Sequence, residues 1–243
     1  MNIFILFLLG LSTLLNVLVP ISGSATVTPL IAAITDVHSA IGFVGFYFFL
    51  SAVLRFIFFY TDIQWPLVKK LLPISAVGSA VGALSLLAIP DMVLLGILAV
   101  LTLYFLMKKI FRPQAQRKEN IFSRWGAVVV GLLSGFLQGT GLAGSDLRNN
   151  YLYANNLSII QVHGTTAIVG GLNFFLATVI RLYLGKISFP DIGLLLTIVP
   201  FMIVGTILGR KVALKLSKKH EQWIVVLVMG VGLLLVLQKM FSV

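Results

Sequence analysis

The chain has 243 residues, of which 59% are hydrophobic and only 10% are charged. A soluble domain carries about 25% charged residues, so this composition excludes an ordinary water-soluble domain. The formal net charge is +11 and cysteine is absent, which excludes disulfides, thiolate metal sites and cysteine nucleophiles.

The chain opens on an apolar stretch, residues 1–34, that small and polar residues interrupt at 20–24. A secretory signal begins with basic residues, whereas the first Lys or Arg of this chain is Arg55. The stretch also has a counterpart inside the chain, at 122–155. We therefore expect residues 1–34 to be retained as part of the folded protein.

Six further stretches have the length and the apolar character of membrane-spanning helices. A helix needs ~18–20 apolar residues to cross the hydrocarbon layer of a bilayer, and no polar stretch between them is long enough to form a soluble domain. The sequence therefore predicts an all-α, polytopic membrane protein. The six stretches are residues 41–60, 67–89, 92–111, 163–183, 189–209 and 222–242.

A pattern of small residues and prolines occurs twice along the chain. The matched positions are Gly10 with Gly131, Gly23-Ser24 with Gly144-Ser145, Gly42 with Gly164, and Pro73 with Pro200. The pattern predicts two repeats, residues 1–112 and 122–243, that are joined by a basic cytoplasmic linker at 113–121. Each repeat is expected to open with a broken helical segment, which three transmembrane helices follow.

The basic residues indicate how the repeats lie in the membrane. They cluster at the ends of apolar stretches, as cytoplasmic anchors do, rather than on a surface that could bind nucleic acid. If each broken segment crossed the membrane once, the basic loop 210–219 would lie outside, against the positive-inside rule. If each segment is a re-entrant hairpin, Arg148 lies within the second hairpin and only Arg181, Lys186 and Lys239 lie outside. The count favours hairpins, which gives the two repeats inverted topologies.

The two hairpin tips form the predicted binding site. Ser24 and Ser145 are placed to cap the helices that follow them, and Gly23 and Gly144 allow a positive φ and a close backbone approach. Helix starts that face each other near the middle of the membrane offer N–H groups to a small anion. Alternatively, these small residues serve only to pack helices together.

Polar side chains extend this predicted site. Arg148 could bind an oxyanion with its planar fork, and Asp146 could balance that charge or accept a coupling proton. Alternatively, residues 146–150 form a solvated turn at the membrane surface. His38 and His163 are expected to be interface histidines, so that no metal site or catalytic site is predicted. Thr165 and Asn173 either line the path or bridge helices. The predicted substrate-binding residues are Ser22, Gly23, Ser24, Thr26, Thr140, Gly141, Gly144, Ser145, Asp146, Arg148, Thr165 and Asn173.

Four segments give the whole chain a resemblance to a known family. They are Ser22–Pro29, His38–Gly42, Gly139–Ser145 and Val162–Thr166. In these segments and in its two halves the chain resembles the sulfite exporter (TauE/SafE) family. The resemblance implies a multi-pass secondary transporter of sulfite, sulfonates or other small organic anions in the bacterial inner membrane. The chain departs from the usual motifs in keeping a single glycine before Pro29, and in carrying Asp146 and Arg148.

The sequence and the resemblance together predict a secondary transporter of a small anion, one that contains sulfur, working by alternating access around the two tips. Coupling to a proton or a sodium ion, the direction of transport and the oligomeric state are open. No cofactor is expected, and the chain lacks the Gly-x4-Gly-Lys-[Ser/Thr] phosphate loop of ATPases. The alternatives are an anion channel, a membrane-embedded enzyme and an assembly factor, although the chain offers few groups for intramembrane catalysis.

Overall fold

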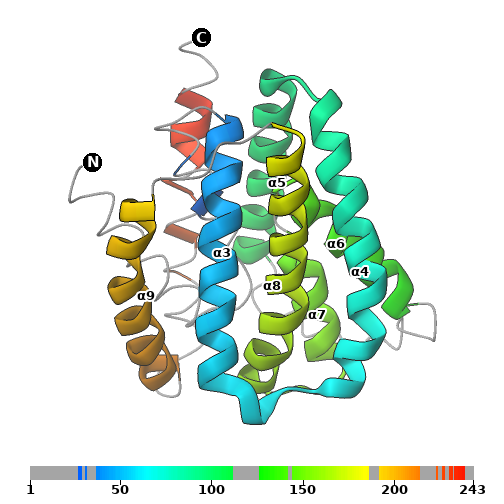
Figure 1. The fold of residues 1–243 in the computed structure, drawn as a ribbon, viewed down its shortest axis with the longest axis vertical. Coiled ribbons are helices and arrows are strands. Elements are labelled where there is room, and N and C mark those ends of the chain that lie inside the picture. Colours follow the sequence, from blue (N-terminus) through cyan, green and yellow to red (C-terminus); the bar gives the residue numbers. More distant parts are fainter. Residues whose placement is uncertain are drawn as a thin grey trace. The chain divides into compact units, whose positions relative to one another are not determined.

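Helices form all of the regular structure in the described part of the chain (Figure 1). The computed structural model describes residues 27–28, 31, 37–111, 126–141, 144–185, 192–213, 223, 226–227, 230–231 and 233–238. The α-helices are α3 (Val37–Phe59), α4 (Trp65–Ser85), α5 (Asp91–Phe111), α6 (Gly126–Gly139), α7 (Ser145–Ala154), α8 (Ile159–Tyr183) and α9 (Ile192–Ala213). Two one-turn 3-10 helices, η1 (Tyr60–Asp62) and η2 (Leu86–Ala88), follow α3 and α4.

The predicted spans agree with the helices of the structure. Helices α3, α4, α5, α8 and α9 cover the first five predicted stretches, and the described residues between 223 and 238 are helical. Within the described residues, three segments are long and apolar enough to cross a membrane, namely Ala40–Asp62, Trp65–Ser85 and Ile159–Tyr183. The prediction of an all-α protein with several membrane-spanning helices is therefore confirmed.

The chain divides into two compact units, each of which takes residues from both halves of the sequence. One contains Met1–Val44, Ala88–Ala115 and Ile187–Val243, and the other contains Gly45–Leu87 and Gln116–Lys186. We call the second the hairpin unit, because it contains α6 and α7. The broken segment of the first half lies almost wholly outside the described residues, so the inverted topology of the repeats stays a prediction.

Helices α4 and α9 resemble each other in one respect that the sequence repeat predicts. Each contains a proline within the helix, Pro73 in α4 and Pro200 in α9. Counting from Trp65 and from Ile192, both prolines occupy the ninth position of their helix. The shared position of the two prolines agrees with the sequence pattern, and the repeat itself stays a prediction.

Within the hairpin unit, α8 packs against both α3 and α4. The rings of Phe48 and Phe174 stack with their centroids 4.9 Å apart, and those of Phe49 and Phe175 lie 5.0 Å apart.

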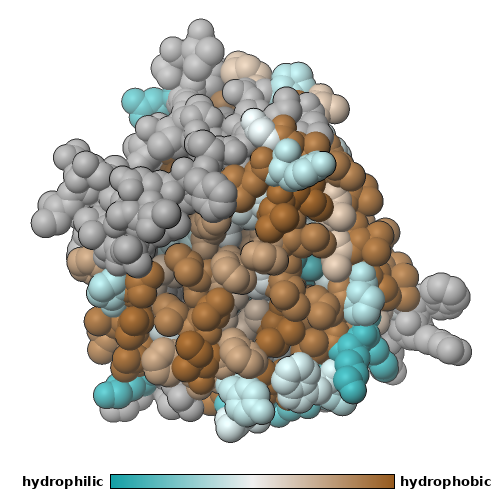
Figure 2. All heavy atoms as spheres, in the orientation of Figure 1, coloured by the Kyte–Doolittle hydropathy of each residue, from teal (hydrophilic) through white to brown (hydrophobic). Residues whose placement is uncertain are grey.

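The outward faces of α3 and α4 are hydrophobic, whereas hydrophilic residues gather near the first turns of α4 (Figure 2). Ile57, for example, is 63% exposed. Such an apolar outer surface is what a lipid environment requires.

Glycines let α6 pack closely against α4. A Cβ atom on Gly135 or Gly139 would overlap with the carbonyl oxygen of Ser75 or Ser79. Likewise, a Cβ atom on a glycine of α4 would overlap with the backbone of α6. Small residues four positions apart commonly allow this approach between membrane helices. We call this contact the glycine seam; it consists of Gly78 and Gly82 of α4 and Gly135 and Gly139 of α6.

Helices α6 and α7 form a helical hairpin. Helix α6 ends at Gly139 and α7 begins at Ser145, so only a few residues separate them. The start of α6 and the end of α7 share one hydrophobic cluster with the first half of α4. In that cluster Ala127 and Val130 lie with Tyr151 and Leu152. The chain therefore enters through α6, turns, and returns through α7 to the same end of α4.

We expect Gly135→Ala to lower the free energy of unfolding by about 1–3 kcal/mol, because its methyl group has no room against the backbone of Ser75. Thermal unfolding of the purified protein measures this effect. Gly96→Ala in α5 is the matched control, since nothing lies within 4 Å of the position of its Cβ atom. Equal losses of stability in the two variants would contradict the close packing of α4 and α6.

Candidate functional site

The turn between α6 and α7 is the tip of the hairpin. Thr140 and Gly141 follow α6, and Gly141 has a φ of 80°, which favours glycine. Gly144 is the N-cap residue of α7, with a φ of −70°, and Ser145 is the first residue of that helix. The prediction of Ser145 as N-cap is thus wrong by one residue, because Gly144 takes that position. The positive φ that the sequence allows at Gly144 occurs instead at Gly141.

Gly144 nevertheless makes the close backbone approach that the sequence predicts. A Cβ atom at Gly144 would overlap with the carbonyl oxygen of Ser134 and would lie 2.8 Å from the backbone nitrogen of Gln138. The first turn of α7 therefore rests directly on α6. This packing fixes the direction in which the next turn of α7 presents its side chains.

Polar residues of α7 face the interior of the hairpin unit. Asp146 and Arg148 are each 2% exposed, and Asn149 is 1% exposed. The alternative of a solvated turn over residues 146–150 is therefore wrong, because these residues are helical and, apart from Asn150, not exposed. A buried charge is costly to place inside a membrane protein, and it marks a functional site by default.

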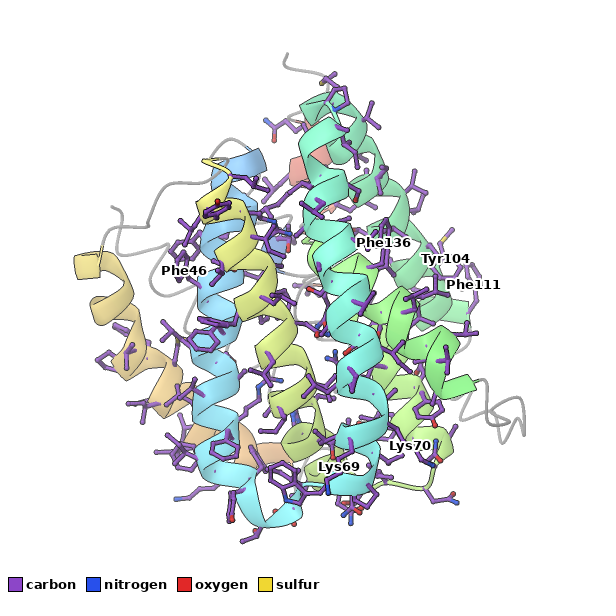
Figure 3. The ribbon with its side chains drawn as sticks, turned by 45° about the vertical axis from the view of Figure 1, so that its right-hand side comes forward. Phe46, Lys69, Lys70, Tyr104, Phe111 and Phe136 are labelled. Carbon is purple, nitrogen blue, oxygen red and sulfur yellow. The ribbon has the colours of Figure 1, made fainter. Side chains whose placement is uncertain are left out.

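Arg148 belongs to a hydrogen-bond network that joins four helices. Its Nη1 atom donates to Oε1 of Gln138 at 2.7 Å, and Nδ2 of Asn173 donates to the same oxygen at 3.0 Å. Ser75 Oγ donates to Oδ1 of Asn173 at 3.3 Å, and Ser79 Oγ donates to its backbone carbonyl at 2.9 Å. Nitrogen and oxygen atoms of side chains accordingly gather between α4 and α8 (Figure 3). Asn173 thus bridges helices and also orients the partner of Arg148.

Several donors of this interior have no acceptor. In the described part of the chain, Nε of Arg148 and Nε2 of Gln138 are buried and make no hydrogen bond. Arg181, near the end of α8, is fully buried and donates its Nη2 atom to the carbonyl oxygen of Gly139. Its Nε and Nη1 atoms also lack an acceptor among the described residues. Buried polar groups are nearly always hydrogen-bonded, so these N–H groups are available to a ligand that supplies acceptor oxygens.

Gly170 of α8 leaves the space that the Arg148 side chain occupies. A Cβ atom at Gly170 would lie 2.8 Å from Nη2 of Arg148 and 3.4 Å from its Cζ atom. The guanidinium group therefore lies against the bare backbone of α8. Asp146, two residues earlier on α7, interacts electrostatically with Arg148, as does Arg55 on α3.

Two threonines among the predicted site residues make structural hydrogen bonds. Thr165 is fully buried, and its Oγ1 atom accepts a hydrogen bond from the backbone nitrogen of Gln64, at 3.1 Å. Thr140 donates its hydroxyl hydrogen to the carbonyl oxygen of Leu137, at 2.9 Å. Thr165 of α8 is thus hydrogen-bonded to Gln64, the N-cap residue of α4. This contact bridges two helices, which is one of the two roles expected for Thr165. The predicted residues Ser22, Gly23, Ser24 and Thr26 lie outside the described residues.

His163 lies near the start of α8, and its side chain is buried. Its side chain is 2% exposed, and its ring stacks on that of Phe59 with centroids 5.4 Å apart. The interface position of His163 stays a prediction, and the side chain of His38 lies outside the described ones. Among the described residues no three His, Asp or Glu side chains are grouped to hold a metal ion.

Sequence reasoning missed two central residues of the site, Gln138 and Arg181. Gln138 could have been found, because it is a polar residue in an otherwise apolar helix just before the break at 139–145. Arg181 was counted as an outside anchor, because basic residues near the end of a span usually serve that role. Its complete burial and its bond to Gly139 depend on a contact over 42 positions, which no local pattern reveals.

The chemistry of these residues favours a negatively charged ligand. Two buried guanidinium groups and one amide present unbonded N–H groups, and such groups bind carboxylates, phosphates and related oxyanions through charge-assisted hydrogen bonds. Asp146 supplies a single negative charge nearby. An anion would complete the hydrogen bonding and would offset the remaining positive charge.

Comparison with known proteins agrees with this chemistry. Residues 4–236 match the family model of the sulfite exporter TauE/SafE. No curated protein and no solved structure matches the chain. The match covers nearly the whole sequence, and the family consists of membrane transporters rather than enzymes. The chain belongs to the sulfite exporter TauE/SafE family.

Proposed function

We propose that the protein is a secondary transporter of a small sulfur-containing oxyanion, such as sulfite or a sulfonate, and that Arg148 binds this anion. The observation that carries the proposal is the unbonded Nε atom of a buried arginine in a network that joins α4, α6, α7 and α8. An arginine held in this way has a donor atom, Nε, ready for an oxygen atom of the anion.

Each residue of the network has a role in this proposal. Gln138 accepts from Arg148 and presents its own unbonded amide N–H toward the anion. Asn173 holds Gln138 in place, and Ser75 and Ser79 hold Asn173. Asp146 balances the charge of Arg148 when no anion is bound, and it is the acceptor for a coupling proton if one is used.

The re-entrant hairpin supports transport by alternating access. Non-helical backbone at membrane depth is tolerated only where protein or a water-filled cavity surrounds it, and broken helices of this kind form substrate sites in transporters with inverted repeats. The distribution of Lys and Arg supports the inverted arrangement of residues 1–112 and 122–243 in a bacterial inner membrane. We further propose that the tip at Ser22–Thr26 contributes N–H groups of the same kind.

A ligand panel tests the proposal on the full chain, purified in detergent. We expect sulfite, thiosulfate or methanesulfonate to raise the unfolding temperature above the value in chloride at equal ionic strength, with formate and oxalate compared in parallel. A ligand at 100 times its Kd adds about 2.7 kcal/mol to stability. Uptake into liposomes should saturate with concentration.

Two results would count against this function. If no sulfur oxyanion stabilises the protein or enters the liposomes, the transported solute is of another class. If uptake occurs but rises linearly without saturation, the protein conducts as a channel rather than as a carrier.

A further inference from the structure

Arg181 is a fully buried cation without a described counter-ion. It has the largest side chain among those that are less than 2% exposed. Its only hydrogen-bond partner in the described part of the chain is the neutral carbonyl of Gly139 at the end of α6. A cation near a helix C-terminus is favourable, but one carbonyl leaves Nε and Nη1 without acceptors. Burying an unpaired guanidinium is costly, so a stabilising role alone does not account for it.

Arg148 and Arg181 donate hydrogen bonds to consecutive residues at the end of α6. Arg148 binds the side chain of Gln138, and Arg181 binds the backbone of Gly139. Consecutive Cα atoms are only ~3.8 Å apart, so both guanidinium groups contact the last turn of α6, next to the tip. The two arginines come from different helices, α7 and α8, and therefore approach that tip independently.

We propose that Arg181 is a second anion-binding residue and that it selects anions with three oxygen atoms at one end over carboxylates. This inference rests on the proposed function. One guanidinium fork can satisfy the two oxygens of a carboxylate. A sulfite or sulfonate group has a third oxygen, and the unbonded Nε and Nη1 atoms of Arg181 are the donors that remain for it.

The test compares the binding of sulfite and formate to four purified proteins, by ligand-induced shifts of the unfolding temperature. These proteins are the unsubstituted protein, Arg181→Gln, Arg181→Lys and Lys69→Gln. We expect Arg181→Gln to weaken sulfite binding at least tenfold and to change formate binding less than threefold. Arg181→Lys keeps the charge but loses the fork, so it should lose part of the preference for sulfite.

Lys69→Gln is the matched control, because it also removes one positive charge from the hairpin unit. Lys69 and its neighbour Lys70 are exposed and lie in the first turns of α4 (Figure 3). If Arg181 only holds the end of α6, Arg181→Gln will lower the unliganded unfolding temperature and leave the ratio of sulfite to formate affinity unchanged. That result would overturn the inference.

The two arginine variants keep the test decisive if one of them fails to fold. Should Arg181→Gln be unstable, an unchanged preference for sulfite in Arg181→Lys overturns the inference equally. Failure of the proposed function gives a different result, since the unsubstituted protein would then bind no sulfur oxyanion at all.

Discussion

Replacing Arg148 with alanine is expected to reduce sulfite uptake at least about 100-fold, while folded protein still reaches the membrane. Hydrogen bonds to a charged group contribute ~1.5–3 kcal/mol each, and two lost bonds of ~1.5 kcal/mol correspond to a factor of about 100. In this variant Oε1 of Gln138 still accepts a hydrogen bond from Nδ2 of Asn173, at 3.0 Å. The substitution therefore leaves this buried oxygen with a hydrogen-bond partner. Liposome uptake measures the first effect, and size-exclusion chromatography of the membrane extract measures the second.

Two further substitutions are the comparisons for Arg148→Ala. Arg148→Lys retains the charge without the fork, and it should transport at an intermediate rate. Lys69→Ala removes an exposed charge from α4 and should leave uptake unchanged. If Arg148→Ala transports sulfite as fast as the unsubstituted protein, Arg148 is not part of the binding site.

Gly170→Ala is expected to weaken sulfite binding about tenfold with little loss of stability. The new methyl group would lie 2.8 Å from Nη2 of Arg148, which is the mobile end of a long side chain, so the guanidinium moves and the helices do not. A displaced side chain that leaves its preferred rotamer costs ~0.5–1.5 kcal/mol, and ~1.4 kcal/mol is a factor of ten in affinity. Ligand-induced thermal shifts measure the affinity, and the unliganded unfolding temperature measures the stability.

The opposite result is expected for Gly171, the residue next to Gly170. A Cβ atom at Gly171 would lie 2.6 Å from Cβ of Ala52 on α3, a contact that only a shift of the backbone relieves. Gly171→Ala should therefore lower the unfolding temperature and leave sulfite affinity near its normal value. If both variants lose stability and neither loses affinity, Gly170 serves packing alone.

The helices could be predicted from the sequence because the run of apolar residues directly reports burial in lipid. The predicted span 163–183 corresponds to α8, and 67–89 corresponds to α4. The break between α6 and α7 could also be predicted, from its small and polar residues, whereas the re-entrant topology deduced from the positive charges stays a prediction. These features depend on composition and length, which tertiary packing does not alter.

The site could be predicted only in part, because its geometry depends on contacts between distant segments. Arg148 was found from its position after a small-residue break. Thr165 was predicted either to line the path or to bridge helices. Its hydroxyl accepts a hydrogen bond from the backbone nitrogen of Gln64, which lies 101 positions earlier in the chain. The helix start differs from the prediction by one residue, since the backbone turns at Gly141 and leaves Gly144 as the cap. Whether a polar side chain faces the ligand or holds another side chain in place depends on how distant segments pack together.

The glycine seam has a mechanical consequence for the transport cycle. With backbone against backbone at Gly135 and Ser75, α6 has no flexible side chains at this contact on which to slide along α4. We therefore expect α4 and α6 to move together at this contact, with the hairpin tip at the end of α6. A conformational change that tilts α4 between Gly78 and Gly82 would then carry the tip with it.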